Sequence, residues 1–102
     1  MIKVNVKRQN NKVYEIVIKG HAGYDEAGKD IVCAAVSSMA ITTINNIIAL
    51  DDSIDYEENS GLLIIRIKED TKVNQKLLNN LVRMFTELET QYPKNIEIRN
   101  ED

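Results

Sequence analysis

The chain has 102 residues, of which 43% are hydrophobic and 28% are charged, and its formal net charge is −3. This length accommodates one domain with its own hydrophobic core but not two, and the composition excludes a disordered chain. The acidic balance provides no broad positive field, which argues against a protein that binds nucleic acid directly.

The first 19 residues alternate between apolar and polar side chains, with an interruption at Gln9-Asn10-Asn11. This pattern predicts a hairpin of two strands. The same alternation lacks the continuous apolar stretch of a signal peptide. The apolar-rich segment 31–50 is interrupted by Ser, Thr and Asn, which suit a lipid-facing span poorly. The single cysteine allows no internal disulfide, so we expect a cytoplasmic protein that does not enter a membrane.

Residues 20–30 are rich in glycine and charge, which predicts a coil, and Asp30 is a suitable N-cap for the helix that follows. Residues 31–50 carry the small and apolar side chains of a central helix, which we expect to be buried on most sides. Two further strands are predicted at 53–57 and 62–68, joined by the turn residues 58–61. The continuous apolar run at the start of the second strand suggests that it lies inside the sheet.

A second helix is predicted from Asp70 or Thr71 to Pro93, because apolar residues recur there every three or four positions. Its apolar stripe consists of Val73, Leu77, Leu78, Leu81, Met84, Phe85, Leu88 and Tyr92. Residues 95–99 supply a last short strand. The order ββαββαβ predicts a single α+β domain over residues 1–102, with a two-layer architecture in which two helices lie on one face of a mixed sheet of about five strands.

The segment Gly23 to Lys29 matches the first seven letters of a phosphate-binding loop. The match ends at Asp30, where a Ser or Thr would bind magnesium, and Asp25 and Glu26 would repel a triphosphate. A zinc site is equally poorly supported, since the chain offers one histidine and one cysteine. We therefore expect neither a metal ion nor a cofactor.

Cys33 admits two interpretations. It lies in an apolar run, where a cysteine is usually a small buried side chain. If Asp30 caps the helix, however, Cys33 lies in its first turn, where free N–H groups and the helix dipole lower the pKa of a thiol and form an oxyanion hole. His21, just after a strand end, is then positioned by sequence to act as a general base. The residues alone leave both interpretations open.

The stretch Gly20-His21-Ala22, a glycine-containing loop, and then Asp30-Ile-Val-Cys33-Ala-Ala-Val-Ser37 resembles the signature of the ribosomal-processing cysteine protease family, Prp. The resemblance implies a small domain with the element order predicted above. It also implies a homodimeric endopeptidase that removes a short N-terminal extension from the precursor of a large-subunit ribosomal protein.

By this resemblance Cys33 is the nucleophile and His21 the general base. Gly20, Asp30 and Ser37 occupy other characteristic positions. Asp30 could cap the helix or orient the catalytic histidine. Ser37 could support the site or hydrogen-bond to the helix backbone. The sequence leaves both questions open.

The resemblance further implies an apolar pocket near Cys33, which the segment from residue 22 to 29 would close over bound peptide with Gly23 and Gly28 as hinges. Asp25 and Glu26 either attract basic residues of the substrate or form an ordinary solvated loop. The alternative function is a non-catalytic ribosome-associated or assembly protein that binds the same precursor tail without cutting it.

Overall fold

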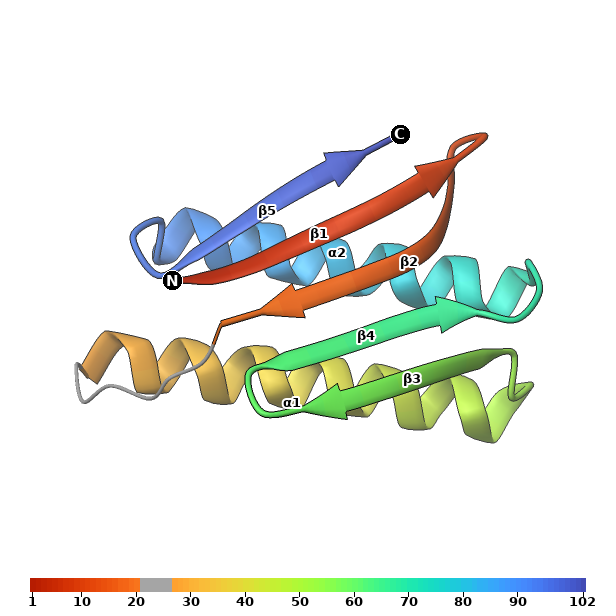
Figure 1. The fold of residues 1–102 in the computed structure, drawn as a ribbon, viewed down its shortest axis with the longest axis horizontal. Coiled ribbons are helices and arrows are strands. Elements are labelled where there is room, and N and C mark those ends of the chain that lie inside the picture. The colour runs from red at the N-terminus through yellow and green to blue at the C-terminus, as the bar shows by residue number, and fades with distance from the viewer. Residues whose placement is uncertain (21–26) are drawn as a thin grey trace.

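The computed structural model describes residues 1–20 and 27–102, with residues 27–30 described by their backbone alone. The elements follow the predicted order ββαββαβ, and Figure 1 shows both helices behind one face of a single sheet. The elements are β1 (Ile2–Gln9), β2 (Lys12–Lys19), α1 (Ala27–Leu50), β3 (Ile54–Asn59), β4 (Leu62–Ile67), α2 (Lys72–Gln91) and β5 (Ile96–Glu101). The predicted two-layer α+β fold is confirmed.

The sheet has five strands in the order β3-β4-β2-β1-β5. All neighbouring strands are antiparallel except β1 and β5, which run parallel, so the sheet is mixed as predicted. β4 pairs with both β3 and β2, which confirms that the apolar run at its start belongs to an inner strand. The helix-facing side chains of β1 and β2, such as Val4, Val6 and Ile16, are fully buried and form the centre of the core.

Both hairpins form where the turn residues predicted them. Asn10 and Asn11 take positive φ angles of 54° and 64°, which are the angles of the two-residue turn that best matches the twist of paired strands. Asparagine tolerates this left-handed region better than most residues do. In the second hairpin β3 continues to Asn59, two residues beyond its predicted end, and Gly61 takes a φ of 73° in the turn.

Helix α1 differs from its prediction in two respects. It begins at Ala27, so Asp30 lies inside the helix and the predicted N-cap at Asp30 is wrong. The predicted burial on most sides is also wrong, because only about a third of the apolar segment Ile31–Leu50 is buried. One stripe faces the sheet and α2 and consists of Val32, Val36, Ala40, Thr43, Ile44 and Ile47. The opposite face lies in solvent, because none of the other described elements covers it.

The segment Ile31–Leu50 is long and apolar enough to cross a membrane by length and composition alone. The core helix of a globular protein meets the same criteria. Here the segment packs one stripe against the sheet and α2, within a single hydrophobic core. The structure therefore gives this helix a role within the globule.

Helix α2 matches its prediction closely. The Thr71 hydroxyl accepts a hydrogen bond from the Asn74 backbone N–H at 3.0 Å, and the Thr71 N–H donates to Asn74 Oδ1 at 3.3 Å. This reciprocal capping identifies Thr71 as the N-cap, one of the two predicted residues. The helix ends at Gln91, just before Pro93. Of the predicted apolar stripe, Leu78, Leu81, Phe85 and Leu88 are buried and the other four are half-buried.

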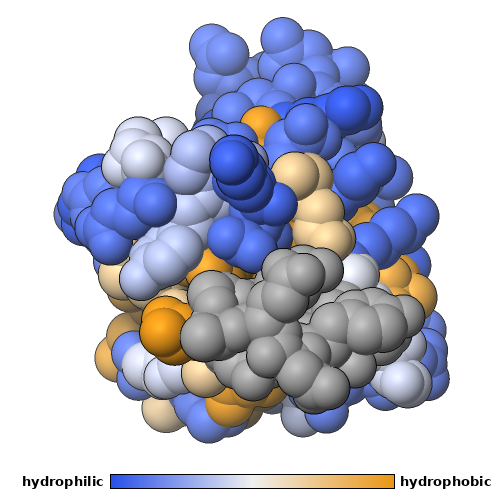
Figure 2. Space-filling model, turned by 90° about the vertical axis from the view of Figure 1, so that its left-hand side faces the viewer, coloured by the Kyte–Doolittle hydropathy of each residue, from blue (hydrophilic) through white to orange (hydrophobic). Residues whose placement is uncertain are grey.

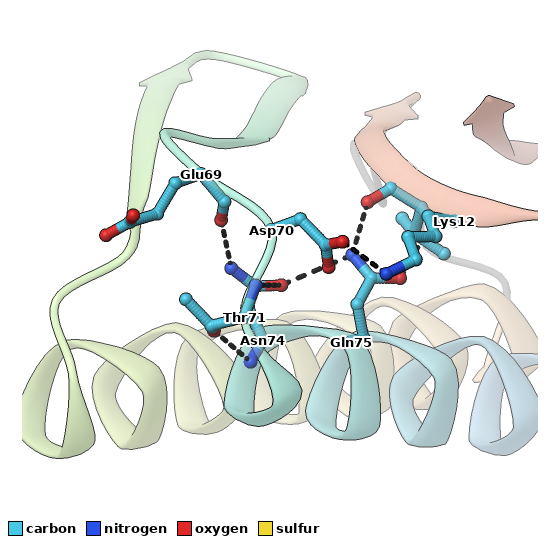
Figure 3. A network of polar contacts seen from close by, with 7 residues as sticks. Lys12, Glu69, Asp70, Thr71, Asn74 and Gln75 are labelled. Carbon is cyan, nitrogen blue, oxygen red and sulfur yellow. Dashed lines mark hydrogen bonds and ion pairs between the residues drawn. The ribbon is translucent and has the colours of Figure 1, made fainter. Parts of the chain in front are cut away.

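The side chain of Asn74 is completely buried and bonds three segments of the chain. Figure 3 shows its contacts with Glu69 and with the start of α2. Its amide nitrogen donates to Ser53 Oγ at 2.9 Å and to the Glu69 carbonyl at 2.7 Å. The neighbouring Gln75 side chain bonds both the N–H and the carbonyl of Val13 in β2. These amides tie the start of α2 to β2 and to the segment before β3, which fixes how the helix lies on the sheet.

Candidate functional site

A cavity of about 450 Å³ lies between α1 and the end of the sheet at which β2 stops and β4 starts. Its lining residues come from α1, from the four strands β1 to β4 and from the residues that directly follow β2 and β3: Ile2, Ile18, Gly20, Cys33, Val36, Ser37, Ala40, Ile41, Glu58, Asn59, Ser60, Gly61, Leu62 and Leu63. Figure 2 views the molecule from the end at which β2 stops and α1 begins, where apolar side chains are visible among the more numerous polar ones. One wall of the cavity is thus apolar, and the wall formed by the turn is polar.

Cys33 is half-buried and lines this cavity. It packs at the margin of the core rather than inside it. A thiol in this position contacts apolar neighbours on one side and opens to the cavity on the other. The interpretation of Cys33 as an ordinary fully buried core residue is therefore excluded.

Cys33 does not lie in the first turn of its helix, as the predicted cap at Asp30 required. Because α1 begins at Ala27, Cys33 is the seventh helical residue and lies in the second turn. The backbone N–H groups that a helix leaves unpaired belong to its first four residues, here 27–30. The predicted oxyanion hole formed by N–H groups of the turn that carries Cys33 is therefore not supported by this helix boundary.

Ser37 lies one helical turn after Cys33 and also lines the cavity. Residues four positions apart on a helix share a face, which is why both side chains reach the same space. Ser37 is exposed. It is therefore available to a molecule in the cavity.

Gly20 directly follows β2 and anchors the strand end that precedes His21. Its φ is +99°, and its N–H donates a hydrogen bond to the Gly61 carbonyl at 3.0 Å. A Cβ at this position would lie 2.5 Å from the Met1 carbonyl oxygen, which is too close for any side chain. Both the backbone angle and the contact require glycine. The resemblance singled out Gly20 without a reason, and the structure supplies one.

The remaining predicted site residues fall on or beside residues 21–26, which are not among the described residues. His21, Gly23, Asp25 and Glu26 lie outside the described residues. Gly28 lies with Asp30 in the first turn of α1, so the prediction of a coil is wrong for residues 27–30. Within residues 1–20 and 27–102, no group of three or more His, Cys, Asp or Glu side chains is arranged to hold a metal ion.

Sequence reasoning missed the contribution of residues 58–61 to this site. Their composition predicted a turn but not its neighbours. The turn borders the cavity that Cys33 also lines only because β4 pairs with β2, which places the start of β4 beside the end of β2. Strand pairing between distant segments leaves no local signal in the sequence.

Comparison with known proteins identifies the family. Residues 1–97 match the family model described as cysteine protease Prp. The ribosomal processing cysteine protease Prp of Staphylococcus aureus (strain NCTC 8325) is 31% identical over 103 residues, covering 96% of this chain and 97% of the relative. The protein of the same description from Bacillus subtilis (strain 168) is 26% identical, covering 96% of each chain.

Comparison with solved structures leads to the same family. The crystal structure of the Staphylococcus aureus Prp protease with a covalently linked product peptide has a TM-score of 0.86 at 30% identity, covering 99% of this chain and all of that one. A Streptococcus mutans protein has a TM-score of 0.84 at 28% identity, covering 99% of this chain and 94% of that one. With its family model, its relatives and its fold in agreement over nearly the full length, this chain belongs to the Prp family of ribosomal processing cysteine proteases.

Proposed function

We propose that this chain is an endopeptidase that removes a short N-terminal extension from the precursor of a large-subunit ribosomal protein, with Cys33 as nucleophile and His21 as general base. The observation that carries the proposal is the position of Cys33, half-buried on the wall of a cavity that also contains Gly20, the residue before His21. The Staphylococcus aureus relative has been crystallised with a substrate peptide and with a covalently linked product peptide.

The proposed chemistry uses the thiol of Cys33 as nucleophile and the imidazole of His21 as base. His21 takes the proton of the Cys33 thiol, and the thiolate attacks the carbonyl carbon of the scissile peptide bond. The C–N bond breaks as His21 returns the proton to the leaving amine, which leaves an acyl group on the sulfur. Water, deprotonated by His21, then hydrolyses this thioester and restores the thiol.

The two walls of the cavity suit a peptide that carries an apolar side chain before the cut. Ile18, Val36, Ala40 and Leu63 offer the apolar surface, and a volume of about 450 Å³ is within the range of sites for small ligands. We propose that the segment with Gly23, Asp25 and Glu26 closes over the bound peptide. Ser37, beside Cys33 on the helix, is then a polar contact for the peptide or for the thiol, and Asp30 supports the site from the first turn of α1.

Mass spectrometry of a purified reaction tests the assignment. The protein is incubated with a synthetic peptide spanning the junction between the extension and the mature ribosomal protein. We expect cleavage by the wild type and none by Cys33→Ala or His21→Ala. Ser38→Ala is the matched control, because Ser38 is exposed on the same helix and does not line the cavity. Cleavage by Cys33→Ala would refute the assignment, and peptide binding without product from the wild type would support the assembly-protein alternative.

We also propose that the protein is a cytoplasmic homodimer that pairs through the outer face of α1. Ile31 is 55% exposed there and Ile48 is 37% exposed. Residues 31–50 contain no charged side chain, which is unusual for a helix face in contact with water. Exposed large apolar side chains on an uncharged helix face are typical of interaction sites.

Sedimentation analysis of Ile48→Lys tests the dimer. A lysine on this face introduces a charge that a two-fold interface would have to bury, so the variant should sediment as a monomer at concentrations where the wild type is dimeric. Thr42→Lys, at another exposed position of the same helix, shows how far the interface extends around α1. A wild type that is monomeric at all concentrations would contradict the proposal.

A further inference from the structure

We infer that Glu58 selects substrates by binding a lysine or arginine side chain of the peptide that crosses the cavity, an inference that rests on the proposed endopeptidase function. Glu58 lies in β3, at the turn that forms the polar wall. Of the fourteen described residues that line the cavity, it is the only one with a charged side chain.

The position of Glu58 breaks the pattern of the sheet. Residues opposite one another on paired strands point to the same face. The row that contains Glu58 continues through Leu63, Ile18, Val4 and Ile98, which are all apolar. This row faces the helices, because Ile18 and Val4 are buried in the core. Glu58 is the only carboxylate on the helix-facing side of the five strands, and it lies at the end of its row beside the cavity.

The carboxylate of Glu58 has no cation to neutralise it among the described residues. The adjacent Glu57 points to the opposite face, where Arg66 bonds it at 3.0 Å. Glu15 and Asp70 are likewise paired, with Arg66 and Lys12. Glu58 is exposed, so a cation that arrives with the substrate can reach it. An unpaired carboxylate at the rim of an apolar cavity favours a substrate with a basic side chain next to an apolar one.

A structural role for the charge competes with this inference. β3 is an edge strand, and a charged residue that points inward is one means of preventing an edge from pairing with another chain. The two roles predict different consequences of removing the charge. Loss of substrate selection follows only from the first, and self-association follows only from the second.

The experiment compares wild type, Glu58→Gln and Glu58→Lys on a set of junction peptides in which each Lys or Arg is replaced in turn by Met. For the wild type we expect one replacement to lower kcat/KM by about threefold, mainly through KM, as for an exposed charge pair of about 0.7 kcal/mol. Glu58→Gln should cleave the parent peptide with a kcat/KM about threefold below that of the wild type. The same replacement in the peptide should not lower the kcat/KM of this variant further. Glu58→Lys should instead prefer a peptide with Glu at that position, and added salt should reduce every difference.

Glu69→Gln is the matched control, because Glu69 forms no ion pair with a described residue and lies in the segment between β4 and α2, outside the cavity lining. It should leave the preference unchanged.

If Glu58→Gln keeps the wild-type preference at every basic position, the inference is wrong, and self-association of that variant in light scattering would assign Glu58 to edge protection. If the wild type cleaves no peptide, the proposed function fails. Dissociation constants of the same peptides for the same variants then decide whether Glu58 binds a basic side chain.

Discussion

Replacing Gly20 with alanine tests whether the strand end before His21 must be held rigidly. The φ of +99° at Gly20 is unfavourable for any residue with a Cβ and costs about 1–3 kcal/mol. The new Cβ would also lie 2.5 Å from the Met1 carbonyl oxygen. One of the two must move by about 1 Å to reach an ordinary contact, and overpacking of this kind costs about 1–3 kcal/mol. We therefore expect the free energy of unfolding to fall by about 3 kcal/mol, out of the roughly 5–15 kcal/mol typical of such domains.

Urea denaturation followed by circular dichroism measures the loss, and peptide cleavage measures the effect on the site. Because misplacement of a catalytic group by about 1 Å can lower the rate about 100-fold, the kcat/KM of the folded Gly20→Ala variant should fall far more than its folded fraction does. Gly61→Ala is the control, with a φ of 73° and a penalty of about 1–2 kcal/mol for a left-handed residue. If Gly20→Ala is no less stable than Gly61→Ala, the contact with Met1 does not constrain the strand end and the reasoning fails.

Two further predictions concern the scaffold. Asn74→Ala removes the partners of the Glu69 carbonyl and the Thr71 N–H, at about 1–3 kcal/mol for each partly buried group, so its urea midpoint should indicate a loss of about 3 kcal/mol. Asn80→Ala on the same helix should change it little, and equal losses would contradict the role of Asn74. Burial opposes ionisation of Glu15, but hydrogen bonds from Lys7 and Arg66 outweigh it and lower the pKa of Glu15. The unfolded chain then binds the proton of Glu15 more readily than the folded chain does. The stability that ionised Glu15 contributes is therefore fully present above its unfolded pKa near 4.5, and it is lost as the pH falls through the lower pKa of the folded state. Glu15→Gln should therefore have a lower free energy of unfolding than the wild type at pH 7. An equal difference between the two proteins at pH 2 would contradict this account.

The fold could be predicted because its signals are local. The turn at Asn10-Asn11 needs residues that tolerate positive φ angles, and asparagines stand there. The alternation on either side specifies two half-buried strands. In α2 the three- and four-residue spacing and the cap at Thr71 are likewise contained within one segment. Each of these features requires only neighbours in the sequence.

Helix α1 could not be predicted as well, because its composition is uniform. Apolar and small residues occur on all sides of residues 31–50, so no polar face marks the side in contact with solvent. Only the tertiary structure separates buried Val36 from exposed Ile31 and Ile48. The start of the helix was misplaced because Asp30 suits a cap by residue type, whereas the helix continues back to Ala27.

The candidate site was predicted in part. The resemblance picked out Cys33 and Ser37, and the structure brings both to one cavity with Gly20. The roles of Cys33 and His21 remain predictions. Glu58 was read only as a turn residue, because its significance depends on the apolar row that it terminates across five strands. Asn74 was passed over for a similar reason, since a buried amide looks like any polar helix residue until its partners are known.

The parallel pairing of β1 with β5 has a consequence for when the protein becomes competent during its synthesis. Ile2 lies opposite Ile96 and donates its N–H to the Asn95 carbonyl at 2.9 Å, and the same Ile2 lines the cavity beside Cys33. β5 is the last of the five strands to leave the translating ribosome. A nascent chain without it lacks the neighbour that positions the first strand, so we expect the cavity to assemble only after translation has passed β5. We therefore expect a nascent chain that still lacks β5 to cleave no peptide.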